Sequence, residues 1–313
     1  MELFLPAALF LLGLACIIKG GDLFVDAAAW IAEVSGIPKV IVGATVVSLA
    51  TTLPEVLVSL MAAFAGKTDM AVGNAVGSVT ANSGLILGLS IVLAPFAVRR
   101  KDYAVKGGLM LAAVAALMLF SKSGQLTAGG SAVLLGIFAL FLWENVSSAR
   151  RSGPLSPAAA PNRREIGGNT VKFLLGTAGI VIGAHLLVDN GSLLAAALGV
   201  PESVIGVTVI AVGTSLPELV TAITAVVKKQ GALSAGNILG ANIIDTTLIL
   251  PLCSLTSGQA LPISLQGVML DIPACLLISL LAIVPTLLRR RFSRLQGAAM
   301  LALYGSYVAV VVS

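Results

Sequence analysis

Long apolar runs separated by short polar connections recur along the whole chain. A run of about 20 apolar residues is long enough to cross the hydrocarbon core of a bilayer as a helix. The pattern therefore predicts an all-α polytopic membrane protein with ten transmembrane helices. These spans are expected at residues 3–32, 37–64, 70–97, 104–120, 126–148, 170–197, 203–227, 232–254, 263–288 and 295–312.

Composition supports a membrane protein and excludes an ordinary soluble domain. Hydrophobic residues make up 58% of the chain and charged residues 11%, whereas soluble domains carry roughly 25% charged residues. The mean hydropathy of +1.04 points the same way. The three cysteines, Cys16, Cys253 and Cys275, lie in apolar runs at unrelated spacings, so we expect buried free thiols.

The basic residues predict the orientation of the chain. An isoelectric point of about 9.3 is compatible with a nucleic-acid partner, but the distribution of the charges argues against one. Of the 19 Lys and Arg residues, 16 fall in the connections that follow odd-numbered spans. Cytoplasmic connections carry such an excess, so we expect these connections in the cytoplasm and both termini outside it. The 16 residues are Lys39, Arg99, Arg100, Lys101, Lys106, Arg150, Arg151, Arg163, Arg164, Lys172, Lys228, Lys229, Arg289, Arg290, Arg291 and Arg294.

An internal repeat divides the chain into two halves. Shifting the second half back by 163 residues places Leu216-Pro217-Glu218 on Leu53-Pro54-Glu55, and the register holds from about Leu11 to Leu93. Each half holds five spans, an odd number, so the halves enter the membrane from opposite sides as inverted repeats. We assign 1–149 to the first repeat (helices 1–5), 150–168 to a cytoplasmic linker and 169–313 to the second repeat (helices 6–10).

The motif Thr51–Glu55, which recurs as Thr214–Glu218, carries the first candidate chemistry. A carboxylate in the middle of a span is energetically costly and marks a functional site. The proline before each glutamate lacks an N–H and frees backbone carbonyls, which predicts that helices 2 and 7 are broken. Carbonyl, hydroxyl and carboxylate oxygens are the ligands that Ca²⁺ prefers. A broken helix is tolerated at membrane depth where it lines a cavity, so we expect a cation site here.

A second pair of motifs, Gly73–Asn82 and Gly236–Asp245, follows the first pair. Ser78 and Asn82 lie four residues apart on one helical face, as do Ala241 and Asp245, and these faces could complete the oxygen shell. Asn74 and Asn237 stand near the starts of their spans, where they could instead cap a helix.

Other polar residues within the spans are weaker candidates. For Asp22, Asp26 and Asp189 the pattern leaves structural pairing and gating equally open. Glu144 and Asp271 lie in spans outside the motifs, so a structural role is favoured for both.

These paired motifs resemble the two alpha repeats of the sodium/calcium exchanger branch of the calcium/cation antiporter superfamily. The resemblance covers nearly the whole chain and implies four cation sites clustered at its centre. It implies that Ca²⁺ is held by Thr51, Glu55, Thr214 and Glu218, and Na⁺ by Ser48, Thr52, Glu55, Ser78, Asn82, Ala211, Ser215, Glu218 and Asp245. Spans one and six would slide past the rest to switch access.

The chain departs from the family pattern at three positions. Ala50 stands where the second half has Gly213. Ala241 stands where the first half has Ser78, which removes one hydroxyl from a flanking Na⁺ site. Val79 stands where the second half has Asn242. These changes leave the Ca²⁺ ligands intact and bear on the coupling ion.

The predicted function is secondary active exchange of Na⁺ for Ca²⁺ by alternating access. The alternative is a Ca²⁺/H⁺ or K⁺-dependent Ca²⁺ exchanger on the same fold. An enzyme is not expected, because no nucleophile–base pair is evident, and no cofactor is expected beyond the transported ions. We expect a monomer in the lipid bilayer, and the compact chain without a recognisable leader favours a prokaryotic plasma membrane.

Overall fold

The structure, a computed structural model, describes residues 3–152, 161–198, 213, 215–258 and 260–312. The α-helices are α1 (Phe4–Ser35), α2 (Lys39–Val42), α3 (Ser48–Thr51), α4 (Leu53–Phe64), α5 (Thr68–Ala81), α6 (Gly88–Leu93), α7 (Arg100–Phe120), α8 (Ala128–Ser152), α9 (Arg163–Ala197), α12 (Leu216–Val227), α13 (Gly231–Ile244), α14 (Leu250–Thr256), α15 (Ile272–Arg289) and α16 (Arg294–Val312). Segments of π-helix are η1 (Gly43–Val47), η2 (Asn82–Leu87), η4 (Asp245–Ile249) and η5 (Gly267–Asp271). The strands β1 (Gln125–Leu126) and β2 (Leu261–Pro262) form one antiparallel pair.

Membrane-spanning helices dominate the described chain. Seven of them are long and apolar enough to cross a bilayer, and a bent pair adds an eighth. That pair joins Lys39–Thr51 to Leu53–Phe64 at an angle of 47°, which confirms the predicted break in the second span. Pro54 lies in the first turn of α4, where its missing N–H costs no hydrogen bond. The first part of the seventh span lies outside the described residues, and the count of ten spans stays a prediction.

The described helices leave fewer residues for the linker between the halves than the predicted 150–168. α8 continues to Ser152 and α9 begins at Arg163, so both helices extend into the predicted 150–168 linker. The side chain of Asn162 accepts a hydrogen bond of 2.8 Å from the backbone N–H of Glu165. This N-cap satisfies one free donor of the first turn and allows α9 to begin ahead of its apolar run.

The first and last residues of several helices repeat after 163 residues, the same shift that aligns the two halves of the sequence. Adding 163 to the bounds of α4 and α5 gives those of α12 and α13. The same shift carries Asn82, where η2 begins, onto Asp245, where η4 begins. A π-helical turn is rare and is frequent at functional sites. The inverted relation of the halves and the division at 149 and 168 stay predictions.

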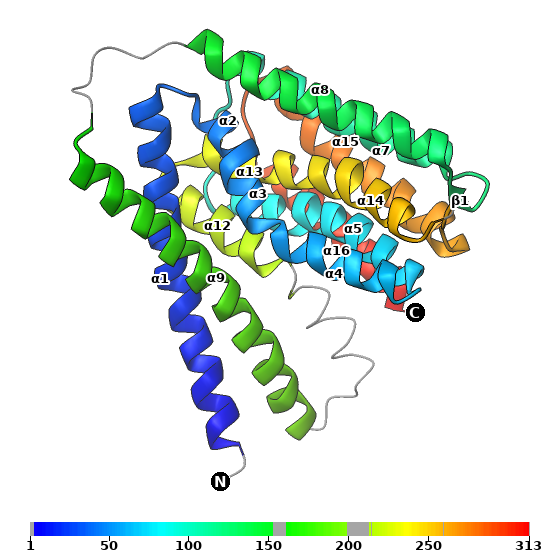
Figure 1. Ribbon diagram of the computed structural model, residues 1–313, viewed down its shortest axis with the longest axis horizontal. Coiled ribbons are helices and arrows are strands. Elements are labelled where there is room, and N and C mark those ends of the chain that lie inside the picture. Colours follow the sequence, from blue (N-terminus) through cyan, green and yellow to red (C-terminus); the bar gives the residue numbers. More distant parts are fainter. Residues whose placement is uncertain (1–2, 153–160, 199–212, 214, 259, 313) are drawn as a thin grey trace.

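The helices α1 and α9 pack closely as an antiparallel pair. A Cβ added at Gly183 would lie 2.7 Å from the carbonyl oxygen of Gly13, and one at Gly176 would lie 2.6 Å from the backbone nitrogen of Phe24. Small residues allow helix backbones to approach within a membrane. Figure 1 shows this pair extending away from the rest of the bundle.

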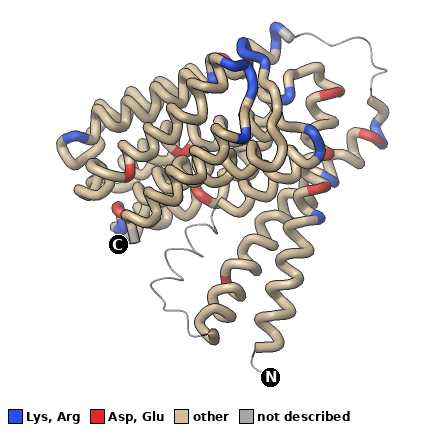
Figure 2. The backbone as a smooth tube through the Cα atoms, turned by 180° about the vertical axis from the view of Figure 1, so that it is seen from behind, with Lys and Arg blue, Asp and Glu red and all other residues tan. Residues whose placement is uncertain are grey.

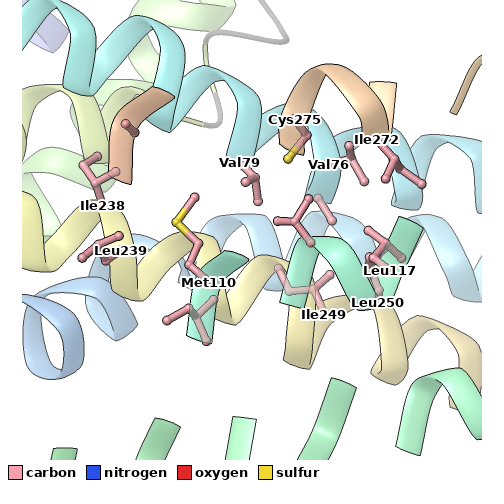
Figure 3. Packing of buried hydrophobic residues seen from close by; sticks show 14 of the residues in the cluster. Val76, Val79, Met110, Leu117, Ile238, Leu239, Ile249, Leu250, Ile272 and Cys275 are labelled. Carbon is pink, nitrogen blue, oxygen red and sulfur yellow. The ribbon is translucent and has the colours of Figure 1, made fainter. Parts of the chain in front are cut away.

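The remaining helices enclose one apolar core. It draws side chains from α5, α7, α13, η4, α14 and α15, and Figure 3 labels Val76, Val79, Met110, Leu117, Ile238, Leu239, Ile249, Leu250, Ile272 and Cys275 within it. Cys253 and Cys275 are buried free thiols as expected, whereas Cys16 is half-buried. This core packs around the two motif pairs and fixes their relative positions.

Candidate functional site

The two motif glutamates occupy the same position in their helices. Glu55 lies in the first turn of α4 and Glu218 in the first turn of α12, each directly after its proline. The N-terminus of a helix carries a partial positive charge, which favours a carboxylate there. Both motifs therefore place an acid at a helix start inside the protein.

Three carboxylates from different elements meet at the centre. Glu55, Glu218 and Asp245 are at most 1% exposed. They lie close enough to act electrostatically on one another, although they belong to α4, α12 and η4. η4 also packs against α4, while η2, which begins at Asn82, packs against α12. The site is thus built from both halves of the chain.

Many polar atoms at this centre have no hydrogen-bond partner within the described protein. They are both carboxylate oxygens of Glu55, both of Asp245, Oε2 of Glu218, both amide atoms of Asn82 and Oγ of Ser215. Leaving one buried polar group unpaired costs about 1–3 kcal/mol, and charged groups cost more. A concentration of such groups in one place requires an explanation. Bound cations would supply partners for the oxygens of this set.

Hydrogen bonds between side chains join the halves around the carboxylates. The Thr52 hydroxyl donates to Oε1 of Glu218 at 3.2 Å. The Thr51 hydroxyl is 3.2 Å from Oδ1 of Asn237, to which it donates. These contacts hold the broken helix of the first half against α12 and α13.

The predicted capping role of Asn74 and Asn237 is wrong. α5 begins at Thr68 and α13 at Gly231, so both asparagines lie within their helices, and the N-cap positions are Lys67 and Gln230. The Asn74 amide instead donates to the Ser59 hydroxyl at 2.9 Å. These residues brace neighbouring helices because a polar side chain inside a span needs a partner.

The other predicted ion ligands are placed as follows. Ser48 and Ser78 are buried, in α3 and α5, and Ser48 faces α13 beside Gly240. Ala211 and Thr214 lie outside the described residues. Among the residues that the structure describes, no three or more His, Cys, Asp and Glu side chains are arranged as a metal centre. A cation would therefore also need hydroxyl, amide and backbone oxygens.

Several acids outside the motifs are used in structural pairing. Asp22 and Asp26 both contact Nζ of Lys228, at 3.2 and 2.8 Å. Glu144 pairs with Lys106 at 2.7 Å. The partners in these pairs were not predicted, because each pair joins side chains of different helices.

The Asn242 amide, also unpredicted, donates to the Ser83 hydroxyl at 2.8 Å. The internal alignment singled out Asn242 as a difference between the halves, which is the only sequence signal for this contact.

Comparisons relate the chain to known proteins. The family model described as sodium/calcium exchanger protein matches residues 5–146 and 169–313. The inner membrane protein YrbG of Escherichia coli (strain K12) is 37% identical over 290 residues, covering 88% of this chain and 87% of that protein. The sodium/calcium exchanger MaX1 of Methanosarcina acetivorans is 30% identical over 344 residues, covering 97% of each.

A solved structure shows the same architecture. The sodium-calcium exchanger NCX_Mj, soaked with 10 mM Na⁺ and zero Ca²⁺, matches this chain with a TM-score of 0.87 and 31% identity. The match covers 98% of this chain and 99% of that one.

Proposed function

Because the chain belongs to the sodium/calcium exchanger family, we propose that it is a secondary active antiporter that exchanges Na⁺ for Ca²⁺ by alternating access. The observation that carries this proposal is the buried set of Glu55, Glu218 and Asp245, whose carboxylates leave five oxygens without a partner. Hard oxygen ligands of this kind suit Ca²⁺ and Na⁺.

Shared ligands supply the mechanism of exchange. We assign Ca²⁺ to the carboxylates of Glu55 and Glu218, with oxygens of Thr51 and Thr214 completing its shell. The flanking Na⁺ sites use the same two glutamates together with Ser48, Thr52, Ser78, Asn82, Ala211, Ser215 and Asp245. Because each glutamate has only two oxygens, Na⁺ and Ca²⁺ compete for them. One ion leaves as the other binds.

Alternating access requires one part of the protein to move past another. The α1–α9 pair is suited to this, because its helices are packed tightly on each other and extend from the bundle (Figure 1). The pair would slide along the motif helices and open the site to one side at a time. We place the protein in a prokaryotic plasma membrane as a monomer, with both termini outside the cytoplasm.

Flux measurements on proteoliposomes test the proposal. Vesicles loaded with Na⁺ and diluted into Na⁺-free buffer should take up ⁴⁵Ca²⁺, and Glu55→Gln and Glu218→Gln should each abolish uptake. Glu33→Gln is the matched control, since Glu33 is an exposed acid at the end of α1.

The results of these flux measurements distinguish the possible coupling ions. Uptake driven by a pH gradient and indifferent to Na⁺ would replace Na⁺ by H⁺ as the coupling ion and implicate Ala241. A requirement for K⁺ together with Na⁺ would indicate a K⁺-dependent exchanger. The absence of Ca²⁺ flux under every gradient would refute the substrate.

A further inference from the structure

Two connections that carry many arginines are joined by a short backbone pairing. The N–H of Val98 donates to the carbonyl of Arg290 at 3.2 Å, and that of Phe292 to the carbonyl of Phe96 at 2.9 Å. Ala97 and Arg291 pair between them in antiparallel fashion. We call residues 96–99 and 290–292 the basic bridge. It lies between the end of α6 and the start of α7, and between α15 and α16.

Aromatic packing makes the basic bridge rigid. The rings of Phe96 and Phe292 lie 4.8 Å apart between centroids, and the Tyr103 ring meets Phe292 edge-on at 5.7 Å. Tyr103 is fully buried and donates its hydroxyl hydrogen to the carbonyl of Ala282. A site beside this bridge is preformed, so a ligand would not have to order it.

The charge around the basic bridge is strongly positive. Figure 2 shows Lys and Arg gathered toward this end of the bundle. The bridge and the helix ends beside it contribute Arg99, Arg100, Lys101, Arg289, Arg290, Arg291 and Arg294. Among these segments, the acid that forms a described ion pair is Asp102, 3.3 Å from Arg99. Arg99 remains 75% exposed in that pair, so the pair contributes little and leaves the guanidinium available.

A cavity of about 200 Å³ opens beside the basic bridge. Its charged residues are Lys39, Arg99 and Asp102, and its apolar walls include Val40, Val98, Tyr103 and Ala232. Lys39 also contacts Glu33 at 3.2 Å, an exposed pair of the weak kind. The cavity thus combines an apolar wall with two cations, of which Arg99 shares its charge with the carboxylate of Asp102.

We propose that this cavity binds the headgroup of an anionic phospholipid from the surrounding bilayer. α7 begins at Arg100 and α15 ends at Arg289, so the cavity lies where membrane-spanning helices leave the hydrocarbon core. A phosphodiester there meets Lys39 and Arg99, and a guanidinium binds phosphate through two parallel hydrogen bonds. The glycerol and upper acyl chain lie along the apolar wall. Basic pockets between transmembrane helices recognise anionic lipids in this way. The site is separate from the cation centre and does not depend on which ions are transported.

Lipid binding to the full-length protein tests the site. Protein purified in an uncharged detergent is titrated with phosphatidylglycerol or phosphatidylcholine, and bound lipid is counted by native mass spectrometry. We expect retention of phosphatidylglycerol and no retention of phosphatidylcholine. The double variant Lys39→Gln with Arg99→Gln should bind phosphatidylglycerol on the order of tenfold more weakly.

Two further double variants and one competing ligand test whether lipid binding is specific to this cavity. Lys67→Gln with Lys122→Gln removes the same charge from the opposite connections and should bind lipid like the wild type. Lys39→Arg with Arg99→Lys keeps both charges and should also bind, which separates charge from misfolding. Unchanged affinity in the glutamine double variant, or an equal loss in the Lys67 and Lys122 control, would overturn the site. Displacement of the lipid by millimolar glycerol phosphate would show that a soluble phosphate is the ligand, and would overturn the assignment to a lipid.

Discussion

The buried ion pair between Lys106 and Glu144 yields a quantitative prediction. Nζ of Lys106 lies 2.7 Å from Oε2 of Glu144, and the side chains are 0% and 12% exposed. The Ser148 hydroxyl donates to the other carboxylate oxygen at 2.7 Å. The pair joins α7 to α8, so its removal reports on the packing of these helices.

Removing one residue of this pair should lower the free energy of unfolding far more than removing both. In Lys106→Met the Glu144 carboxylate stays buried without its partner, and we expect a loss of about 3–5 kcal/mol in the free energy of unfolding. Replacing both residues with Met removes both charges from the interior, and such replacements are often neutral or stabilising. We expect the double variant to recover most of the loss, so the two single effects are strongly non-additive.

Thermal and denaturant unfolding in one detergent would measure these differences. The exposed pair Lys39–Glu33, with side chains 33% and 64% exposed, is the control. Lys39→Met should cost at most about 1 kcal/mol. A cost below about 1 kcal/mol for Lys106→Met, or a double variant as unstable as the worse single variant, would refute the reasoning.

Two further predictions concern helix packing and helix movement. A Cβ added at Gly236 would overlap the carbonyl oxygen of Val40, so Gly236→Ala should lower the stability by about 1–3 kcal/mol. Gly108→Ala, in open space on α7, should be neutral in the same unfolding assay, and equal tolerance of both would contradict the close contact. Lys228, directly after α12, contacts Asp26 and Asp22 of α1 at 2.8 and 3.2 Å, and Lys228→Gln removes this link. Since Lys228 is 27% exposed, the link is worth about 1 kcal/mol or less. The ratio of apparent Ca²⁺ affinities at the two faces, measured in vesicles of opposite orientation, should shift by up to about fivefold. Lys228→Arg should restore the ratio. A ratio that does not change in Lys228→Gln would show that the link does not bias the helix pair.

The residues of the second span were sufficient to predict its break correctly. Pro54 has a direct effect on the hydrogen bonds of its own helix, and the observed break falls between Thr51 and Leu53. The burial of Glu55 and Glu218 also follows from sequence, because both lie within long apolar runs. Inferences of this kind need no knowledge of how distant segments pack.

Side-chain contacts between helices could not be predicted from the sequence. Lys106 was interpreted as part of the cytoplasmic charge excess, whereas the structure buries it completely against Glu144 on the next helix. Asn74 was weighed as a cap because it stands near a span end, but its partner Ser59 comes from α4. The π-helical turns at Asn82 and Asp245 have no local sequence signature, since they depend on how neighbouring helices are accommodated.

The unpartnered oxygens of Glu55 and Asp245 also bear on how tightly the two ion movements are coupled. A carrier without cargo would have to enclose several bare negative charges in a medium of low dielectric constant while it changes sides. Each such charge costs several kcal/mol after relaxation. The return of an empty carrier is therefore slow, whereas a loaded carrier has this cost offset by the cation. A protein built this way has little slippage, because the gradient of one ion dissipates only when the other ion is carried back.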